Sequence, residues 1–261
     1  HTHDHYKYSP SHFPPCCTLM LFRIAPYYVQ HMWMKTADGD GLAAVAYGPS
    51  RMAVEMDGVR VEIEEETGYP FADHALIRVT PERPHTFDLW FRKPTWCPEI
   101  IFDTEAEVDL VDGYYRLHRK WAPGDEIGLT FRMPIRPVES VDGLTALTRG
   151  ALIYAYKIPE KAIPVKEWGE SGLHDYHFKP EYFHHRWNGY CFDRNLGPAF
   201  GFTVDRNDAA DLNDPWTSIP VRLRGKLLIG FGHTHDDVTL VPMGSTVLRR
   251  TTLPVGQYTG P

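Results

Sequence analysis

The sequence predicts a mainly β protein, in which two β-sandwich-like units are preceded by one α-helix. After residue 41, short apolar runs divided by Gly, Pro and Asp recur every 8 to 12 residues or roughly so, which is typical of antiparallel sandwiches. The apolar spacing typical of a helix occurs before them, over residues 18–36. A chain of 261 residues with 43% hydrophobic and 23% charged side chains can also bury a substantial core.

The first part of the chain predicts a lead-in followed by the helix. Residues 1–15 are polar, aromatic and proline-rich, which favours an extended segment. Apolar side chains spaced mainly by three or four then run from Leu19 to Trp33. Pro26 interrupts this pattern, and because proline suits a first helical turn, we expect the regular part of the helix to begin there.

The rest of the chain predicts strands. Asp57-Gly58 separates runs at 53–56 and 59–63 and is a two-residue hairpin signal. Other runs predict further strands at residues 42–47, 75–80, 86–92, 99–103, 114–121, 126–133, 151–157, 218–223, 227–231, 238–241 and 246–252.

The predicted elements divide the chain into three parts. We expect a lead-in and helix over residues 1–37, a first β-sandwich over 38–145 and a second β unit over 146–261. Residues 158–206 are rich in Pro, Gly, His and aromatics without clear periodicity, so the second unit is expected to contain a long irregular loop region.

Charge and hydropathy argue against two classes of partner. The net charge is −7, which disfavours nucleic acid and anionic lipid. The most apolar stretch is broken by Arg23, Pro26, Gln30 and His31, so no membrane span is expected. The chain begins at His1 without a signal-peptide pattern, from which we expect a mature product or part of a longer protein. Its localisation, secreted or cytoplasmic, stays open.

The four cysteines do not form a disulfide framework. Cys16 and Cys17 are adjacent, and a disulfide between them would be strained. An adjacent pair of thiols suggests metal ligation or reactivity, with buried inert thiols as the alternative. Cys97 and Cys191 are expected to be buried thiols.

Seven short motifs occur in an informative order. They are Cys16-Cys17-Thr18, GLAAVAYGPS at 41–50, EETGYPF at 65–71, FRKPTWC at 91–97, WAPGD at 121–125, RGALIY at 149–154 and LVPMGSTVLR at 240–249. This series resembles the C-terminal half of the β-L-arabinofuranosidase-type glycoside hydrolases, family 127 and its relatives. The sequence departs from the family at Met20, where many relatives carry Asn, and at Ala151, where relatives usually carry Pro.

The resemblance implies an enzyme with a catalytic (α/α) six-hairpin barrel followed by β-sandwich domains, and the barrel is absent from this chain. It implies that Cys16 is the nucleophile and a zinc ligand, and that Cys17 is a second zinc ligand. The family's other zinc ligands, a glutamate and a cysteine, and its acid/base glutamate belong to the barrel. The zinc site is therefore expected to be incomplete here.

The implied reaction is retaining hydrolysis of arabinofuranosides or related glycans through a zinc-held cysteine. The implied partners are carbohydrate and either an N-terminal (α/α) barrel region or a further copy of the chain. Because the acid/base carboxylate has no counterpart here, the isolated chain is expected to be inactive. The alternative is a non-catalytic β-sandwich module with a structural or glycan-binding role.

Other side chains have a functional and a structural interpretation. Trp187 with Asn188 is a candidate glycan contact, since an aromatic face complements a sugar ring. Three groups of histidines could bind a metal. For His1, His3 and His5 in the lead-in, a solvated segment is favoured. For the pairs His233 with His235 and His174 with His177, the last on one helical turn, loop hydrogen bonding is favoured. The other expectations are a solvated edge for Glu64, Glu65 and Glu66 and core positions for Trp33, Trp90, Trp96 and Trp121.

Overall fold

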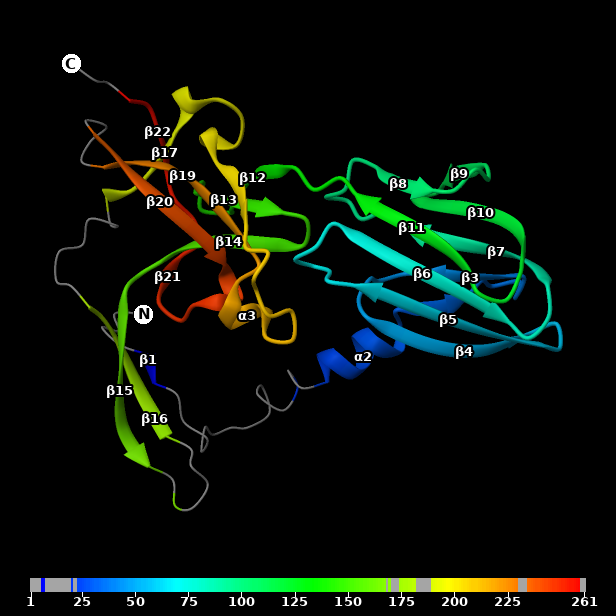
Figure 1. Cartoon of the computed structure of the whole chain (residues 1–261). Helices are drawn as coiled ribbons and strands as arrows, with labels where there is room; N and C mark the ends of the chain where they lie inside the picture. The colour runs from blue at the N-terminus through cyan, green and yellow to red at the C-terminus, as the bar shows by residue number, and fades with distance from the viewer. Residues whose placement is uncertain are drawn as a thin grey trace. The chain divides into compact units, whose positions relative to one another are not determined.

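The structure is a computed structural model that describes residues 6, 7, 20, 23–167, 169, 174–181, 189–229 and 234–258. Most of these residues lie in β-strands (Figure 1), which confirms the predicted mainly β fold. The chain divides into two compact units. We call Cys16–Pro134 the sandwich unit, and Ile135–Pro261 together with His1–Pro15 the C-terminal unit.

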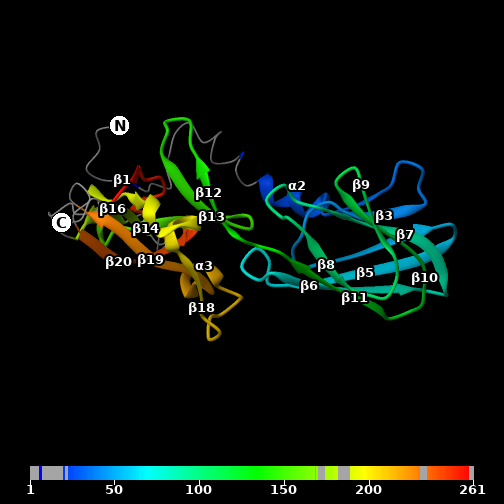
Figure 2. The same ribbon diagram turned by 90° about the horizontal axis from the view of Figure 1, so that it is seen from above.

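The sandwich unit consists of two five-stranded sheets packed face to face, seen in Figures 1 and 2. The first sheet has the order β2-β3-β7-β10-β9, with bounds Trp33–Lys35, Gly41–Ala44, His85–Arg92, Tyr114–Trp121 and Val108–Val111. The second has the order β4-β5-β6-β11-β8, with bounds Ser50–Met56, Val59–Thr67, His74–Pro81, Asp125–Phe131 and Ile100–Asp103. Neighbouring strands are antiparallel except β3 and β7, which are parallel.

Alternation along the strands builds the core between these sheets. On β5, Val59, Val61 and Ile63 are buried, whereas Arg60 on the same strand is exposed. Fully buried side chains from both sheets fill the interior, among them Leu42, Ile77, Leu89, Phe91, Leu117, Trp121, Ile127 and Phe131. Removing these apolar surfaces from water is the main stabilisation of the sandwich unit.

The hairpin predicted at Asp57-Gly58 is confirmed. β4 and β5 pair along their whole length, from Ser50↔Glu65 to Met56↔Val59. Asp57 and Gly58 both have positive φ, 48° and 69°. Two such residues in succession form the primed turn that matches the twist of the flanking strands.

The predicted helix over residues 18–36 is shorter in the structure. Helix α2 spans Ile24–Gln30, with Pro26 in its first turn. Residues Met32 and Trp33 are buried, but Trp33 belongs to strand β2. No residue of α2 itself is buried, and the apolar spacing extended beyond the helix because it continued into the following strand, where Trp33 is buried.

The C-terminal unit is built on a seven-stranded sheet with the order β12-β13-β14-β20-β19-β18, in which β21 also pairs with β14. The strand bounds are Ile135–Glu139, Thr145–Arg149, Leu152–Lys157, Thr234–Pro242, Val221–Ile229, Thr203–Arg206 and Arg249–Arg250. Two small sheets accompany it, β1-β16-β15 with bounds Tyr6–Lys7, His174–Pro180 and Glu160–Glu167, and the parallel pair β17-β22 with bounds Phe192–Asp193 and Val255–Gly256. Short helical segments complete it, namely η3 Arg194–Leu196, η4 Pro198–Gly201, α3 Pro215–Ser218 and η5 Met243–Ser245.

Two sequence expectations differ from this arrangement. The structure divides the chain after Pro134 rather than after residue 145, because β12 pairs along its length with β13. The region 158–206 is also less irregular than expected, because β15 and β16 form an antiparallel hairpin there. Most of β15 is exposed, so the hairpin lacks the alternating apolar pattern that reveals a half-buried strand.

The described residues contain two bounded α-helices, of seven and four residues. The family's (α/α) barrel is therefore not among them. No helix in this part of the chain has the length and apolar character that a membrane span requires.

Candidate functional site

The predicted site residues Cys16, Cys17, Trp187 and Asn188 lie outside the described residues. Elsewhere, the described ranges contain no group of three or more His, Cys, Asp or Glu side chains that could hold a metal ion. The zinc hypothesis therefore depends on the Cys16-Cys17 pair and on ligands that the described residues do not supply.

Cys97 and Cys191 are free thiols with raised pKa values. Cys97 is buried, and its Sγ donates to the carbonyl oxygen of Glu99 at 3.0 Å. Burial is the main cause of the raised pKa at both cysteines. Since the thiolate is the nucleophilic form, raised pKa values make these two thiols poor nucleophiles at neutral pH.

The expectation of a solvated edge at Glu64-Glu65-Glu66 is wrong for Glu65. Strand β5 lies between β4 and β6 and is therefore not an edge strand. The Glu65 side chain lies on the inner face of the sheet and is only 2% exposed. Its Oε1 accepts from the backbone N–H of Gly48 at 3.1 Å and its Oε2 from the Ser50 hydroxyl at 3.4 Å. Burial raises the pKa of Glu65 to about 7, although the hydrogen bonds act in the opposite direction.

The neighbours of Glu65 on β5 face the other way, as expected for adjacent residues on a strand. Arg78 Nη1 contacts Glu64 at 3.0 Å and Glu66 at 3.1 Å on the outer face. The solvated-edge expectation treated the three carboxyl groups alike, whereas the strand places Glu65 in the interior and its two neighbours on the outer face.

Three of the candidate metal-binding histidines lie among the described residues: His174, His177 and His235. His235 Nε2 lies 2.8 Å from Oδ2 of Asp193, which is 1% exposed. Hydrogen bonding is therefore confirmed for His235, but this residue lies on strand β20 and not in the expected loop. His174 and His177 lie on strand β16, where residues three apart face opposite sides. The helical turn expected for that pair is wrong. His1, His3, His5 and His233 lie outside the described residues.

The core expectation holds for two of the four tryptophans. Trp33 and Trp121 are buried, and Trp96 is half-buried against the core. The core prediction for Trp90 is wrong. On β7 this residue alternates with the buried residues Leu89 and Phe91, so its side chain faces outward. The guanidinium of Arg116 covers its ring at 5.4 Å from the centroid.

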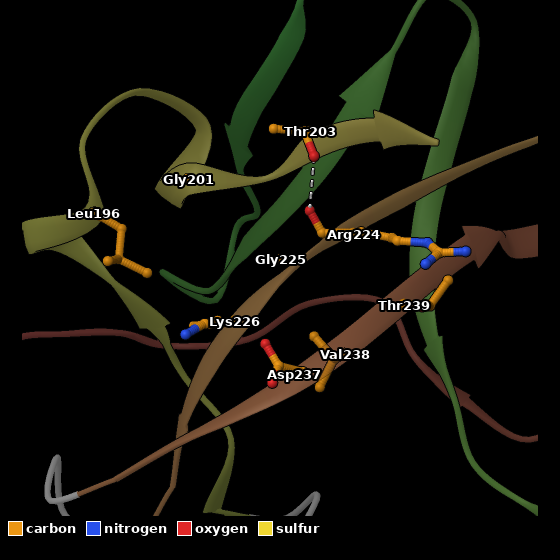
Figure 3. Close-up of a pocket in the computed structure, with 9 residues that line it drawn as sticks. All are labelled: Leu196, Gly201, Thr203, Arg224, Gly225, Lys226, Asp237, Val238 and Thr239. Carbon is orange, nitrogen blue, oxygen red and sulfur yellow. Dashed lines mark hydrogen bonds between the residues drawn. The ribbon is translucent and has the colours of Figure 1, made fainter. Parts of the chain in front are cut away.

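The described residues of the C-terminal unit form a pocket of about 550 Å³ beside strands β18, β19 and β20 (Figure 3). Strand pairing sets Lys226 opposite Asp237 and Arg224 opposite both Thr203 and Thr239. Paired residues present their side chains on one face of a sheet. The residues lining this pocket are Leu196, Gly201, Thr203, Arg224, Gly225, Lys226, Asp237, Val238 and Thr239.

The segment before β18 forms one wall of this pocket and is held by aromatic packing. Phe200 stacks on Phe192 with ring centroids 4.7 Å apart, and Phe202 meets Phe192 edge-on at 5.9 Å. The ring of Phe202 also lies close to Gly225, because a β-carbon added to this glycine would be only 2.6 Å from the ring. Glycine at 225 therefore allows the segment to approach β19 closely.

Some polar side chains of the pocket have hydrogen-bond or ion-pair partners within the protein, and others do not. Arg224 Nε contacts Asp205 Oδ2 at 2.7 Å, and the Thr203 hydroxyl donates to the Arg224 carbonyl at 3.4 Å. By contrast, the Lys226 ammonium and the Asp237 carboxylate have no hydrogen-bond or ion-pair partner among the residues that the structure describes. Figure 3 shows these two side chains next to each other on neighbouring strands.

Sequence reasoning missed this pocket, although one signal was present. In VRLRGK at 221–226, apolar and basic residues alternate, which indicates a strand with one polar face. The partners Thr203 and Asp237 are supplied by other strands, and their pairing with β19 could not be read from this segment.

Comparison with known protein families gives a match over part of the chain. Residues 41–133 match the middle domain of GH127 β-L-arabinofuranosidases. A search of curated proteins gives no significant match.

Solved structures show the same fold over most of the chain. A GH127 β-L-arabinofuranosidase from Geobacillus stearothermophilus T6 is 19% identical with a TM-score of 0.65, over 92% of this chain and 37% of that one. A GH127 β-arabinofuranosidase is 17% identical with a TM-score of 0.69, over 99% and 42%. A protein described as a glycoside hydrolase is 18% identical with a TM-score of 0.57, over 95% and 40%.

The two β units therefore have the fold found in glycoside hydrolases of family 127. The resemblance stated from the sequence motifs is confirmed: residues 41–133 match the GH127 middle domain, and the chain is similar in fold to part of a GH127 β-L-arabinofuranosidase. It spans 37 to 42% of the length of these solved relatives.

Proposed function

We propose that this chain acts in a glycoside hydrolase that cleaves arabinofuranosides or related glycans with retention of configuration. The match of residues 41–133 to the GH127 middle domain is the observation that carries this proposal. The structural likeness to a protein named as a GH127 β-L-arabinofuranosidase supports the substrate class.

Cys16 is the proposed nucleophile. Its thiolate sulfur would bond to the anomeric carbon while the glycosidic C–O bond breaks and the leaving oxygen takes a proton from a carboxylic acid. Water would then displace the sulfur and release the sugar, with the same carboxylate accepting the proton of that water. This acid/base group would come from a barrel region, since the family motifs in the chain supply no counterpart.

Cys16 and Cys17 are the proposed zinc ligands. Zinc, when bound, would keep the cysteine deprotonated at neutral pH, whereas a free thiol has a pKa of about 8.5. Two thiolates fill half of a four-coordinate site, so the remaining ligands would also come from a barrel region. We therefore propose that a barrel region completes the zinc site.

Hydrolysis of an aryl β-L-arabinofuranoside tests this function. We expect turnover by a longer form that contains a barrel region and none by the 261-residue chain alone. A longer form that is folded and zinc-loaded but inactive on arabinofuranosides would refute the substrate class. Full activity of the isolated chain would refute the requirement for further catalytic groups.

A further inference from the structure

We propose that the pocket formed by Lys226 and Asp237 in the C-terminal unit binds a neutral sugar residue without cleaving it. This site is made from residues of the C-terminal unit alone, and the inference does not require the proposed hydrolase activity. It assigns to the unit a carbohydrate-binding role.

The size and lining of the pocket suit one or two sugar rings. Its volume of about 550 Å³ falls within the range of roughly 300 to 1,000 Å³ that small-molecule sites occupy. The side chains of Leu196 and Val238 provide an apolar part next to the charged side chains. A sugar ring needs both kinds of surface, because it presents C–H groups as well as hydroxyls.

The two unpaired groups match the hydrogen-bonding capacity of neighbouring sugar hydroxyls. The Asp237 carboxylate can accept from two O–H groups, and the Lys226 ammonium can donate to hydroxyl or ring oxygens. Lys226 and Asp237 occupy directly paired positions on β19 and β20. A ligand with adjacent hydroxyls can therefore engage both groups at once.

The charge of the pocket favours a neutral ligand over an anion. Arg224 is already paired with Asp205 at 2.7 Å. The positive charge of Lys226 is balanced by Asp237 on the neighbouring strand. With no net positive charge left over, phosphate or a carboxylate ligand would gain from Lys226 but be repelled by Asp237.

The pocket is also built to keep its shape. The stacked pair Phe192 and Phe200 and the contact of Phe202 with Gly225 fix the segment that carries Leu196 and Gly201. Asp193 caps this segment by accepting from the backbone N–H of Asn195 at 2.9 Å. A site that is ordered before binding loses less conformational entropy when the ligand arrives.

NMR titration of the ¹⁵N-labelled 261-residue chain tests the proposal. L-arabinose, D-glucose and inorganic phosphate are added separately, and the amide signals of Gly201, Gly225 and Val238 report on the pocket. We expect a saturable shift of these signals with at least one sugar and none with phosphate. No saturable shift with either sugar, shifts confined to residues outside the pocket, or preferential binding of phosphate would overturn the proposal.

Four variants distinguish pocket binding from general effects. Asp237→Asn and Lys226→Met each remove one charged partner and should weaken sugar binding by about tenfold or more. Asp208→Asn and Lys161→Met remove exposed charges of the same kinds outside the pocket lining and should bind as the unaltered chain does. Unchanged binding in both folded pocket variants would place the sugar elsewhere and overturn the proposal. The titration measures no turnover, so its result is independent of the hydrolase assay.

Discussion

The Glu65 carboxylate accepts a hydrogen bond from the backbone N–H of Gly48, 3.1 Å away, inside the sandwich unit. Burial raises the pKa of Glu65 from 4.5 to about 7 in the folded protein. Below 4.5 both the folded and the unfolded chain hold the proton. As the pH rises from there to about 7, the unfolded chain loses the proton first, so the free energy of unfolding falls.

Glu65→Gln should remove this pH dependence. We expect the variant to gain about 3 kcal/mol of stability relative to the unaltered chain between pH 4.5 and 7.5. Urea unfolding followed by the amide signals of β5 measures it. Glu66→Gln is the matched control, since Glu66 is exposed on the same strand and should retain the original slope. Parallel pH profiles for Glu65→Gln and the unaltered chain would contradict this prediction.

Asp193 predicts the opposite pH response in the C-terminal unit. Burial by itself raises the pKa of Asp193, but hydrogen bonds from Asn195, His235 and Tyr258 outweigh it and lower the pKa below 3.8. The stabilisation is therefore present above 3.8 and is lost as the pH falls through the lower folded value. Asp193→Asn should reduce this acid sensitivity, measured by the urea midpoint of the β19 signals. An unchanged acid slope would argue against it, and Asp208→Asn should leave the slope unaltered.

Gly225 predicts a steric effect. A β-carbon at position 225 would lie 2.6 Å from the Phe202 ring, a contact too short to persist. Gly225→Ala should lower the free energy of unfolding by about 1 to 3 kcal/mol. Chemical denaturation measures it, and the same change in a Phe202→Ala background should cost much less. Equal costs in both backgrounds would show that Phe202 is not the obstacle.

Breaking the ion pair of the buried Asp88 carboxylate should lower the free energy of unfolding more than breaking an exposed ion pair does. Arg116 Nε contacts Asp88 Oδ2 at 2.6 Å, and His118 Nδ1 contacts Oδ1. Arg116→Met leaves the buried charge with one partner and should lower the midpoint of thermal or urea unfolding. Arg51→Met breaks an exposed pair with Glu62, whose attraction is screened by water, and should cost clearly less than Arg116→Met. Equal losses would contradict the difference in burial.

Local patterns predicted much of the sandwich unit. Alternation at Val59, Val61 and Ile63 and the Asp57-Gly58 turn are signals carried by neighbouring residues, and both elements are present in the structure. Asp112-Gly113 is a similar signal, since these residues also have positive φ and join β9 to β10.

What the sequence did not predict depends on long-range packing. The burial of Glu65 needs Gly48 and Ser50 from a different segment. The hairpin of β15 and β16 buries little apolar surface, so its residues carry no periodic signal. The sugar pocket needs three strands to pair, and Thr203, Arg224 and Asp237 give no indication of that pairing when read separately.

The proposed nucleophile is tested most directly by comparing kcat/KM for an aryl β-L-arabinofuranoside between Cys16→Ser and Cys97→Ser in a longer, barrel-containing form. Serine is a poor nucleophile at neutral pH, so Cys16→Ser should lose at least about a thousandfold while keeping its fold. Cys97 donates to the Glu99 carbonyl inside the sandwich unit, so Cys97→Ser should change stability more than turnover. Undiminished turnover by Cys16→Ser would contradict the assignment of Cys16 as the nucleophile.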